Sequence, residues 1–94
     1  LKITVRNITA KDIQDRKLNK NLKGVVITSI SNKSVLVGML RNGDIITEVQ
    51  KNKVLNSKQL NKLIESIYKK GEQTLLLTII NSSNQRRYLG VKTN

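Results

Sequence analysis

The sequence of 94 residues contains no cysteine, no histidine and no proline. Without cysteine the chain can form neither disulfides nor thiol-based sites, and cysteine usage gives no indication of the redox compartment. Without histidine it lacks the most common general base and the most common metal ligand. These absences exclude the usual nucleophilic triads, and we expect no catalytic residue, no metal site and no cofactor in this chain.

Long apolar runs are missing as well. No stretch approaches the roughly 20 apolar residues of a membrane-spanning helix, so we expect no membrane span. The chain opens directly on the strand-like segment Leu1-Lys2-Ile3-Thr4-Val5 and not on the charged and then apolar pattern of a secretory signal. Such a start predicts a fragment of a longer protein, and the length predicts a single domain over residues 1–94.

Acidic residues are scarce, with six Asp and Glu against 18 Lys and Arg and a net charge of +12. Such a charge raises nucleic-acid binding as one possible function. The basic residues are spread along the chain, however, and the enriched Lys, Asn and Ile all have A/T-rich codons. Only two aromatic residues, Tyr68 and Tyr88, are present, which is too few for a base-stacking platform. The composition therefore favours a solvated basic surface and keeps nucleic-acid binding as the alternative.

The first third of the chain predicts two strands around a short helix. Alternating apolar residues over 1–5 indicate a half-buried strand. Thr9 followed by Asp12 resembles a helix-capping signal and predicts a short helix over residues 10–16. The β-branched run over residues 25–30 is typical of a central strand covered on both faces.

The segment over residues 38–56 carries two tight turns around an apolar strand. Asn42-Gly43 tolerates a positive φ, and Asp44 can accept hydrogen bonds from nearby amides that hold the turn. Before this turn, Ser34 predicts a short helical turn over residues 34–37. After it we expect a strand over 45–50, a turn near Lys51-Asn52 and a brief strand over 53–55.

The last part of the chain predicts one long helix and a hairpin. Asn56 or Ser57 caps a helix that extends to about Lys70, followed by Gly71. The apolar residues of this helix recur at a spacing that gives one buried face: Leu60, Leu63, Ile64 and Ile67. Strands over 75–80 and 86–91 complete a small α+β domain.

The carboxylates offer no catalytic arrangement. Asp12 and Asp15 would be neighbours on a short helix, where a solvated pair is expected and not an acid–base dyad. Asp44 is interpreted as holding its turn and Glu48 as exposed. No phosphate-binding loop is present near Gly24. What remains is a binding surface, because an edge strand beside an amphipathic helix forms a groove that can accept a peptide by strand addition.

The order of these elements and three motifs resemble a bacterial PDZ domain, most closely the second PDZ domain of an HtrA/DegP-family serine protease. Gly24-Val25-Val26-Ile27-Thr28-Ser29-Ile30 is similar to the family's GVVVTSV strand. The segment from Ser34 to Ile46 is similar to its SPAAxAGLxxGDVI motif, and that from Asn52 to Ile64 to its NGxxVxSxxELxxxL motif. The resemblance implies a small, partly open barrel or sandwich of five to six strands with one long and one or two short helices.

The resemblance also implies a peptide-binding groove between the first strand and the long helix. A C-terminal carboxylate would bind the amides of Leu1, Lys2 and Ile3, and the peptide would run antiparallel along residues 3–7. The implied site residues are Leu1, Lys2, Ile3, Thr4, Val5, Ser57, Asn61 and Ile64. Core packing remains an equal interpretation of Ile64, and capping is the favoured interpretation of Ser57.

One residue departs from the family pattern in the site itself. Lys2 stands where the family usually has a glycine, whose conformational freedom eases the turn that directs backbone amides toward the carboxylate.

The resemblance implies a non-catalytic module of a periplasmic or cell-envelope protease. Its partners would be peptides, unfolded segments, or other domains and subunits of the parent protease, and Lys2 leaves open a purely assembly role with an occluded groove.

Overall fold

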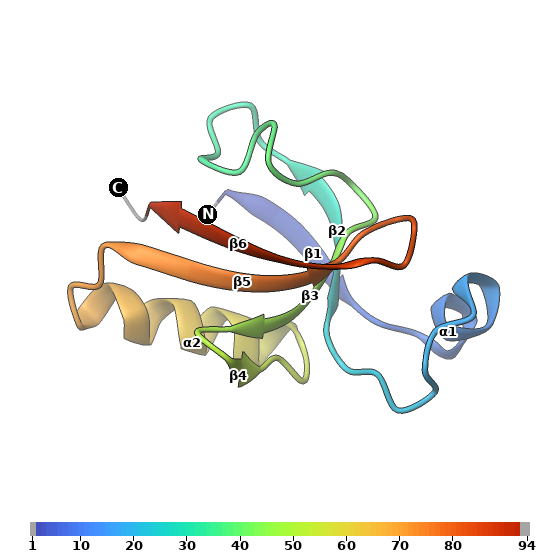
Figure 1. The fold of residues 1–94 in the computed structure, drawn as a ribbon. Coiled ribbons are helices and arrows are strands. Elements are labelled where there is room, and N and C mark those ends of the chain that lie inside the picture. The colour runs from blue at the N-terminus through green and yellow to red at the C-terminus, as the bar shows by residue number, and fades with distance from the viewer. Residues whose placement is uncertain (1, 93–94) are drawn as a thin grey trace.

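A computed structural model of the chain describes residues 2–92. It is an α+β domain with six antiparallel strands in one sheet and two helices (Figure 1). The elements are β1 (Ile3–Asn7), α1 (Ala10–Arg16), β2 (Val25–Ile30), β3 (Ile45–Val49), β4 (Asn52–Lys53), α2 (Ser57–Lys69), β5 (Thr74–Ile80) and β6 (Arg86–Lys92). The sheet order is β1-β2-β3-β5-β6, and β4 pairs with β3 outside this path.

The core lies mainly between the sheet and α2. Leu60 and Ile67 are the buried residues of α2, while Leu63 and Ile64 are partly buried against the same cluster. On β2 the consecutive residues 25–27 are all buried, with Val26 contributing to a second, smaller cluster. The predicted double coverage is thus correct for the first half of β2, whereas Thr28 and Ser29 are exposed.

The predicted turn over residues 34–37 forms, with the Val37 N–H donating to the Ser34 carbonyl at 3.3 Å, but it does not extend into a helix. This segment forms a series of hydrogen-bonded turns, in which the Ser34 hydroxyl accepts the Leu36 N–H at 3.0 Å. Leu36 is fully buried and fastens the segment to the core. Gly38, at a φ of +81°, turns the chain immediately afterwards, and so few residues are too short to nucleate a helix.

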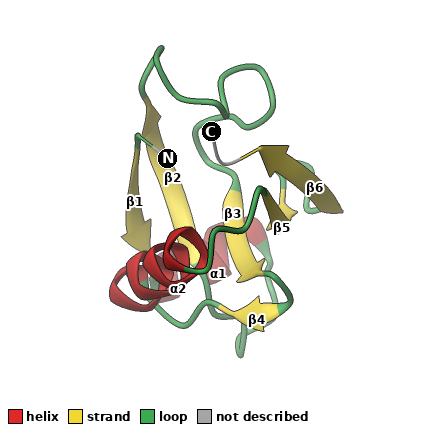
Figure 2. Cartoon of the chain, turned by 90° about the vertical axis from the view of Figure 1, so that its left-hand side faces the viewer, coloured by secondary structure: helices red, strands yellow, loops and turns green. Residues whose placement is uncertain are grey.

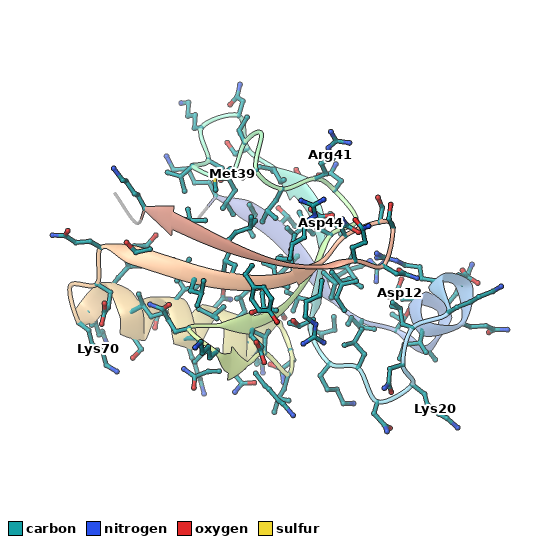
Figure 3. All side chains as sticks on the ribbon, in the orientation of Figure 1. Asp12, Lys20, Met39, Arg41, Asp44 and Lys70 are labelled. Atoms are coloured by element: carbon teal, nitrogen blue, oxygen red, sulfur yellow. The ribbon has the colours of Figure 1, made fainter. Side chains whose placement is uncertain are left out.

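The Asn42-Gly43 turn forms as expected. Gly43 has a φ of +94°, and the Asp44 carboxylate accepts the Arg41 N–H at 3.0 Å. Asp44 is buried, and Figure 3 shows it beside Arg41 at this turn. The Gly43 N–H in turn donates to the Ile27 carbonyl at 2.7 Å, so the turn is fixed to β2.

A single arginine connects α1 to two distant turns. The Arg16 guanidinium donates to the carbonyl of Gly43 at 2.7 Å and to that of Asn81, in the β5–β6 turn, at 2.9 Å. The Asn84 side chain returns a hydrogen bond to the Arg16 carbonyl at 2.7 Å. These bonds hold the projecting α1 against one end of the sheet (Figure 1).

The helices are short relative to a bilayer. Neither helix within residues 2–92 has the length and apolar character needed to cross a membrane.

Candidate functional site

The first strand, β1, leaves one of its edges open. It is the terminal strand of the sheet and pairs only with β2 among the described residues (Figure 2). The carbonyl of Lys2 accepts the Ser31 N–H at 3.0 Å, and the carbonyl of Thr4 accepts the Thr28 hydroxyl at 3.1 Å, so both point toward β2. Because peptide groups alternate in direction along a strand, those of Ile3 and Val5 are directed to the open edge.

The helix α2 lies beside this open edge, as the second wall of the predicted groove. It contacts β1 and runs in the opposite direction (Figure 1). The Asn7 side-chain oxygen accepts the Ser57 N–H at 2.8 Å, which joins the end of β1 to the start of α2. The groove is therefore closed by a hydrogen bond at this end.

The structure brings the predicted helix residues to this side of α2 in different environments. Ile64 is partly buried and packs on the main core together with Ile3 and Val5, so the two interpretations of Ile64 are compatible. Asn61 is exposed, and Ser57 is half-buried. Asn56 is the N-cap, since its side chain accepts the Gln59 N–H at 2.9 Å. The capping function considered for Ser57 thus belongs to its neighbour.

Lys2 adopts a backbone conformation that favours glycine. Its φ is +57°, in the left-handed region that glycine occupies without strain. A side chain there costs about 1 kcal/mol, so the turn before β1 is kept against a local penalty. The Lys2 side chain itself is exposed, and Thr4 is exposed as well. Leu1, the first predicted site residue, lies outside the described residues.

The outward side chain of Arg6 on β1 is paired with a carboxylate of α1. Its guanidinium makes two hydrogen bonds to the Asp12 carboxylate, at 2.6 and 2.8 Å. This hydrogen bonding holds the pKa of Asp12 well below its ordinary value, and the Thr9 N–H and hydroxyl add further hydrogen bonds to the carboxylate. Asp12 therefore acts as a capping residue paired with Arg6, and not as one of a solvated pair with Asp15.

Two hollows lie elsewhere on the described surface, and neither includes a β1 residue. The larger has a volume of about 610 Å³ and lies between residues 17–23 and the region of β3, β4 and the start of β6. The smaller, of about 160 Å³, lies beside the end of α2. The larger hollow was not predicted from the sequence. Its only local signal is the pair Leu18 and Leu22 in an otherwise polar segment.

Comparisons with known proteins give matches among solved structures and no sequence match. No protein-family model matches the chain, and no curated protein matches it significantly. Among solved structures, the chain resembles the HtrA3 PDZ domain, whose crystal structure was determined with a phage-derived ligand of sequence FGRWV. The TM-score is 0.71, the identity is 22%, and the match covers 98% of this chain and 79% of that one. The chain has a PDZ-like fold.

At 22% identity this match establishes the fold alone. Within this PDZ-like fold the chain has the edge strand β1, the antiparallel helix α2 beside it and a sharp turn at Lys2 before the strand. Within residues 2–92, no group of three or more acidic side chains could hold a metal ion.

Proposed function

We propose that the domain is a non-catalytic peptide-binding module that captures C-termini or extended segments by strand addition. The observation that carries this proposal is the open edge of β1 beside α2, with the peptide groups of Ile3 and Val5 directed outward. Strand addition at such an edge supplies affinity through main-chain hydrogen bonds, and side-chain pockets supply selectivity.

The proposed ligand lies antiparallel to β1 along residues 3–7. Its carboxylate approaches the amides of Leu1, Lys2 and Ile3, where the left-handed turn at Lys2 and the lysine charge both favour an anion. The partly buried Ile64 forms an apolar contact for the final side chain of the ligand. Asn61 and Ser57 offer polar contacts further along α2 toward the closed end.

We further propose that the module belongs to a bacterial HtrA/DegP-type protease of the periplasm or cell envelope, as its second PDZ domain. The three sequence motifs support this context, and the structural likeness to the HtrA3 PDZ domain is consistent with it. In such a protein the groove would bind unfolded segments or would contact other domains and subunits to regulate assembly.

Binding of peptides with free and amidated C-termini tests the proposal. A peptide ending in valine should bind to the domain, and amidation of its C-terminus should weaken binding by about tenfold, because the charge-assisted contacts to the amides are lost. Ile64→Glu should abolish binding. The matched control Lys62→Glu, on the exposed side of the same helix, should retain it. Equal binding of free and amidated peptides would contradict carboxylate capture.

The same preparation tests the alternative of a basic nucleic-acid-binding domain. The net charge of +12 favours this alternative, and nucleic-acid affinity from charge alone falls steeply with salt. Strong salt-dependent binding of duplex DNA, together with no binding of any peptide, would replace the proposed function by the alternative.

A further inference from the structure

The larger hollow is a concave surface separate from the peptide groove. It has a volume of about 610 Å³, within the range of ordinary ligand sites, and no residue of β1 or α2 lines it. Its apolar part is formed by Leu18, Leu22 and Ile80, together with Leu55 at the rim. Leu55 is 51% exposed, a large apolar side chain left in solvent beside a hollow.

Residues 17–23 form one wall of the hollow, and packing and hydrogen bonds within the domain fix this segment without a ligand. Leu18 and Leu22 pack on the small cluster of Val26, Ile45 and Ile80. The Leu18 N–H donates to the Ile13 carbonyl at 2.9 Å, and the Leu22 N–H to the Asn19 carbonyl at 2.9 Å. A preformed wall lowers the entropic cost of binding.

The charged residues that line the hollow are almost all of one sign. Lys17, Lys23, Lys53 and Arg86 line it, and Glu48 is the single carboxylate among the lining residues. None of the four cations forms a salt bridge with a carboxylate in the described part of the chain. Lys20, in the same segment, points away into solvent (Figure 3). Unpaired charges of one sign around a concave surface focus the potential onto ligands of opposite sign.

We propose that this hollow is a second docking site, for an acidic peptide segment of a partner protein that carries alternating apolar and carboxylate side chains. The apolar side chains contact Leu22, Leu55 and Ile80, and the carboxylates lie against Lys53 and Arg86. Asn19 and Asn21 also line the hollow, and their side-chain amides provide hydrogen-bonding groups for an extended main chain.

Charge and shape favour this occupant over two others. A second copy of this chain would bring another net charge of +12 to a basic surface, which opposes association. A flat anionic membrane would contact the exposed rim but could not fill a hollow of about 610 Å³. The site is independent of the proposed function, because it shares no residue with the β1–α2 groove.

Fluorescence anisotropy with a labelled peptide of alternating leucine and glutamate tests the proposal. Acetyl and amide blocks on the peptide remove the terminal carboxylate, and any remaining binding as an extended segment along β1 would show as chemical-shift changes at residues 3–7 instead. We expect binding that the double variant Lys53→Glu, Arg86→Glu weakens at least about tenfold, with chemical-shift changes in the wild-type domain at residues 17–23. The double variant Lys11→Glu, Lys62→Glu changes the net charge equally at exposed positions outside the hollow and should bind within about twofold of the wild type.

Four outcomes would overturn the proposal. The first is no binding of the blocked peptide to the wild-type domain. The second is equal weakening in both double variants, which would indicate non-specific attraction to net charge. The third is undiminished binding of a peptide of alternating serine and glutamate, because the apolar contacts would then contribute nothing. Binding to phosphatidylglycerol vesicles without binding of the peptide would assign the surface to membranes and reject the peptide. The milder variant Lys53→Gln, Arg86→Gln repeats the test without charge reversal.

Discussion

The guanidinium of Arg6 on β1 and the carboxylate of Asp12 on α1 form a bidentate pair, with distances of 2.6 and 2.8 Å. The same carboxylate accepts the Thr9 N–H at 2.8 Å and completes a capping box at the start of α1. The strand proposed to bind peptide is therefore attached, on its outer face, to a helix that contributes no residue to the groove.

This pair predicts a pH-dependent contribution to stability. Hydrogen bonding from Arg6 lowers the pKa of Asp12 in the folded state, so the folded protein binds this proton less readily than the unfolded chain. The stabilisation is then complete above the unfolded pKa of about 3.9 and is lost as the pH falls through the lower, folded pKa. Asp12→Asn should cost about 1–2 kcal/mol at neutral pH, and this cost should shrink progressively below about pH 4.

Urea denaturation of wild type and variant at neutral and acidic pH measures this effect. Asp15→Asn is the matched control, because Asp15 lies on the same helix and is exposed. A cost of Asp12→Asn that stayed constant down to pH 2 would show that the carboxylate charge does not contribute.

Arg16 should matter more for stability than its position on a projecting helix suggests. Arg16→Ala removes two hydrogen bonds from a charged donor to main-chain carbonyls and should cost about 1.5–3 kcal/mol in the free energy of unfolding. Arg16→Lys should recover only part of this, since an ammonium group cannot reproduce the planar fork of the guanidinium. Arg41→Ala, at an exposed side chain, should change the free energy of unfolding little. Equal effects of Arg16→Ala and Arg41→Ala would contradict the assigned bridging role.

Gly24 should not tolerate a side chain. A Cβ atom there would lie 2.5 Å from the Ile46 carbonyl oxygen, in a part of the sheet where the backbone cannot easily move. Gly24→Ala should therefore destabilise the domain by about 1–3 kcal/mol. At Gly90 the nearest atom to a new Cβ is a Thr74 methyl group at 3.8 Å, an ordinary contact, so Gly90→Ala serves as the control. Thermal unfolding of both variants checks the difference, and equal melting temperatures would refute the steric argument.

Two substitutions of Lys2 distinguish the effect of its charge on peptide affinity from the effect of its backbone strain on stability. Lys2→Ala removes the ammonium group and keeps a Cβ at a φ of +57°, whereas Lys2→Gly also relieves that strain. Lys2→Gly should therefore be more stable than Lys2→Ala by up to about 1 kcal/mol, while both should show the same loss of affinity for a peptide carboxylate. Chemical denaturation and peptide titration provide the two measurements. Equal stability of the variants would indicate that this turn relaxes when the lysine is removed.

Much of this architecture follows from local sequence signals. The capping signal of Thr9 and Asp12 correctly predicts α1, and the apolar spacing over residues 57–70 correctly predicts α2 and its buried face. The Asn42-Gly43 turn and the hairpin around residues 81–84 also form where expected. These features depend on interactions between residues close in the sequence, and they can therefore be predicted from one sequence.

The remaining features depend on contacts between distant parts of the chain. Arg16 contacts a carbonyl 65 residues away, and no local pattern indicates that partner. The large hollow arises where residues 17–23 meet β3, β4 and β6, so its basic lining is scattered through the sequence. The left-handed conformation of Lys2 was likewise hidden, because lysine gives no local preference for it.

The hydrogen bond between Asn7 and Ser57 makes the two ends of the proposed peptide groove different. It joins strand and helix at one end, whereas no comparable bond joins them at the Lys2 end within the described residues. A small rotation of α2 about this tie would move its last turn much farther than its first. The contact proposed for a ligand's terminal side chain, at Ile64, thus lies away from this bond, whereas the register of a bound strand would be set beside it.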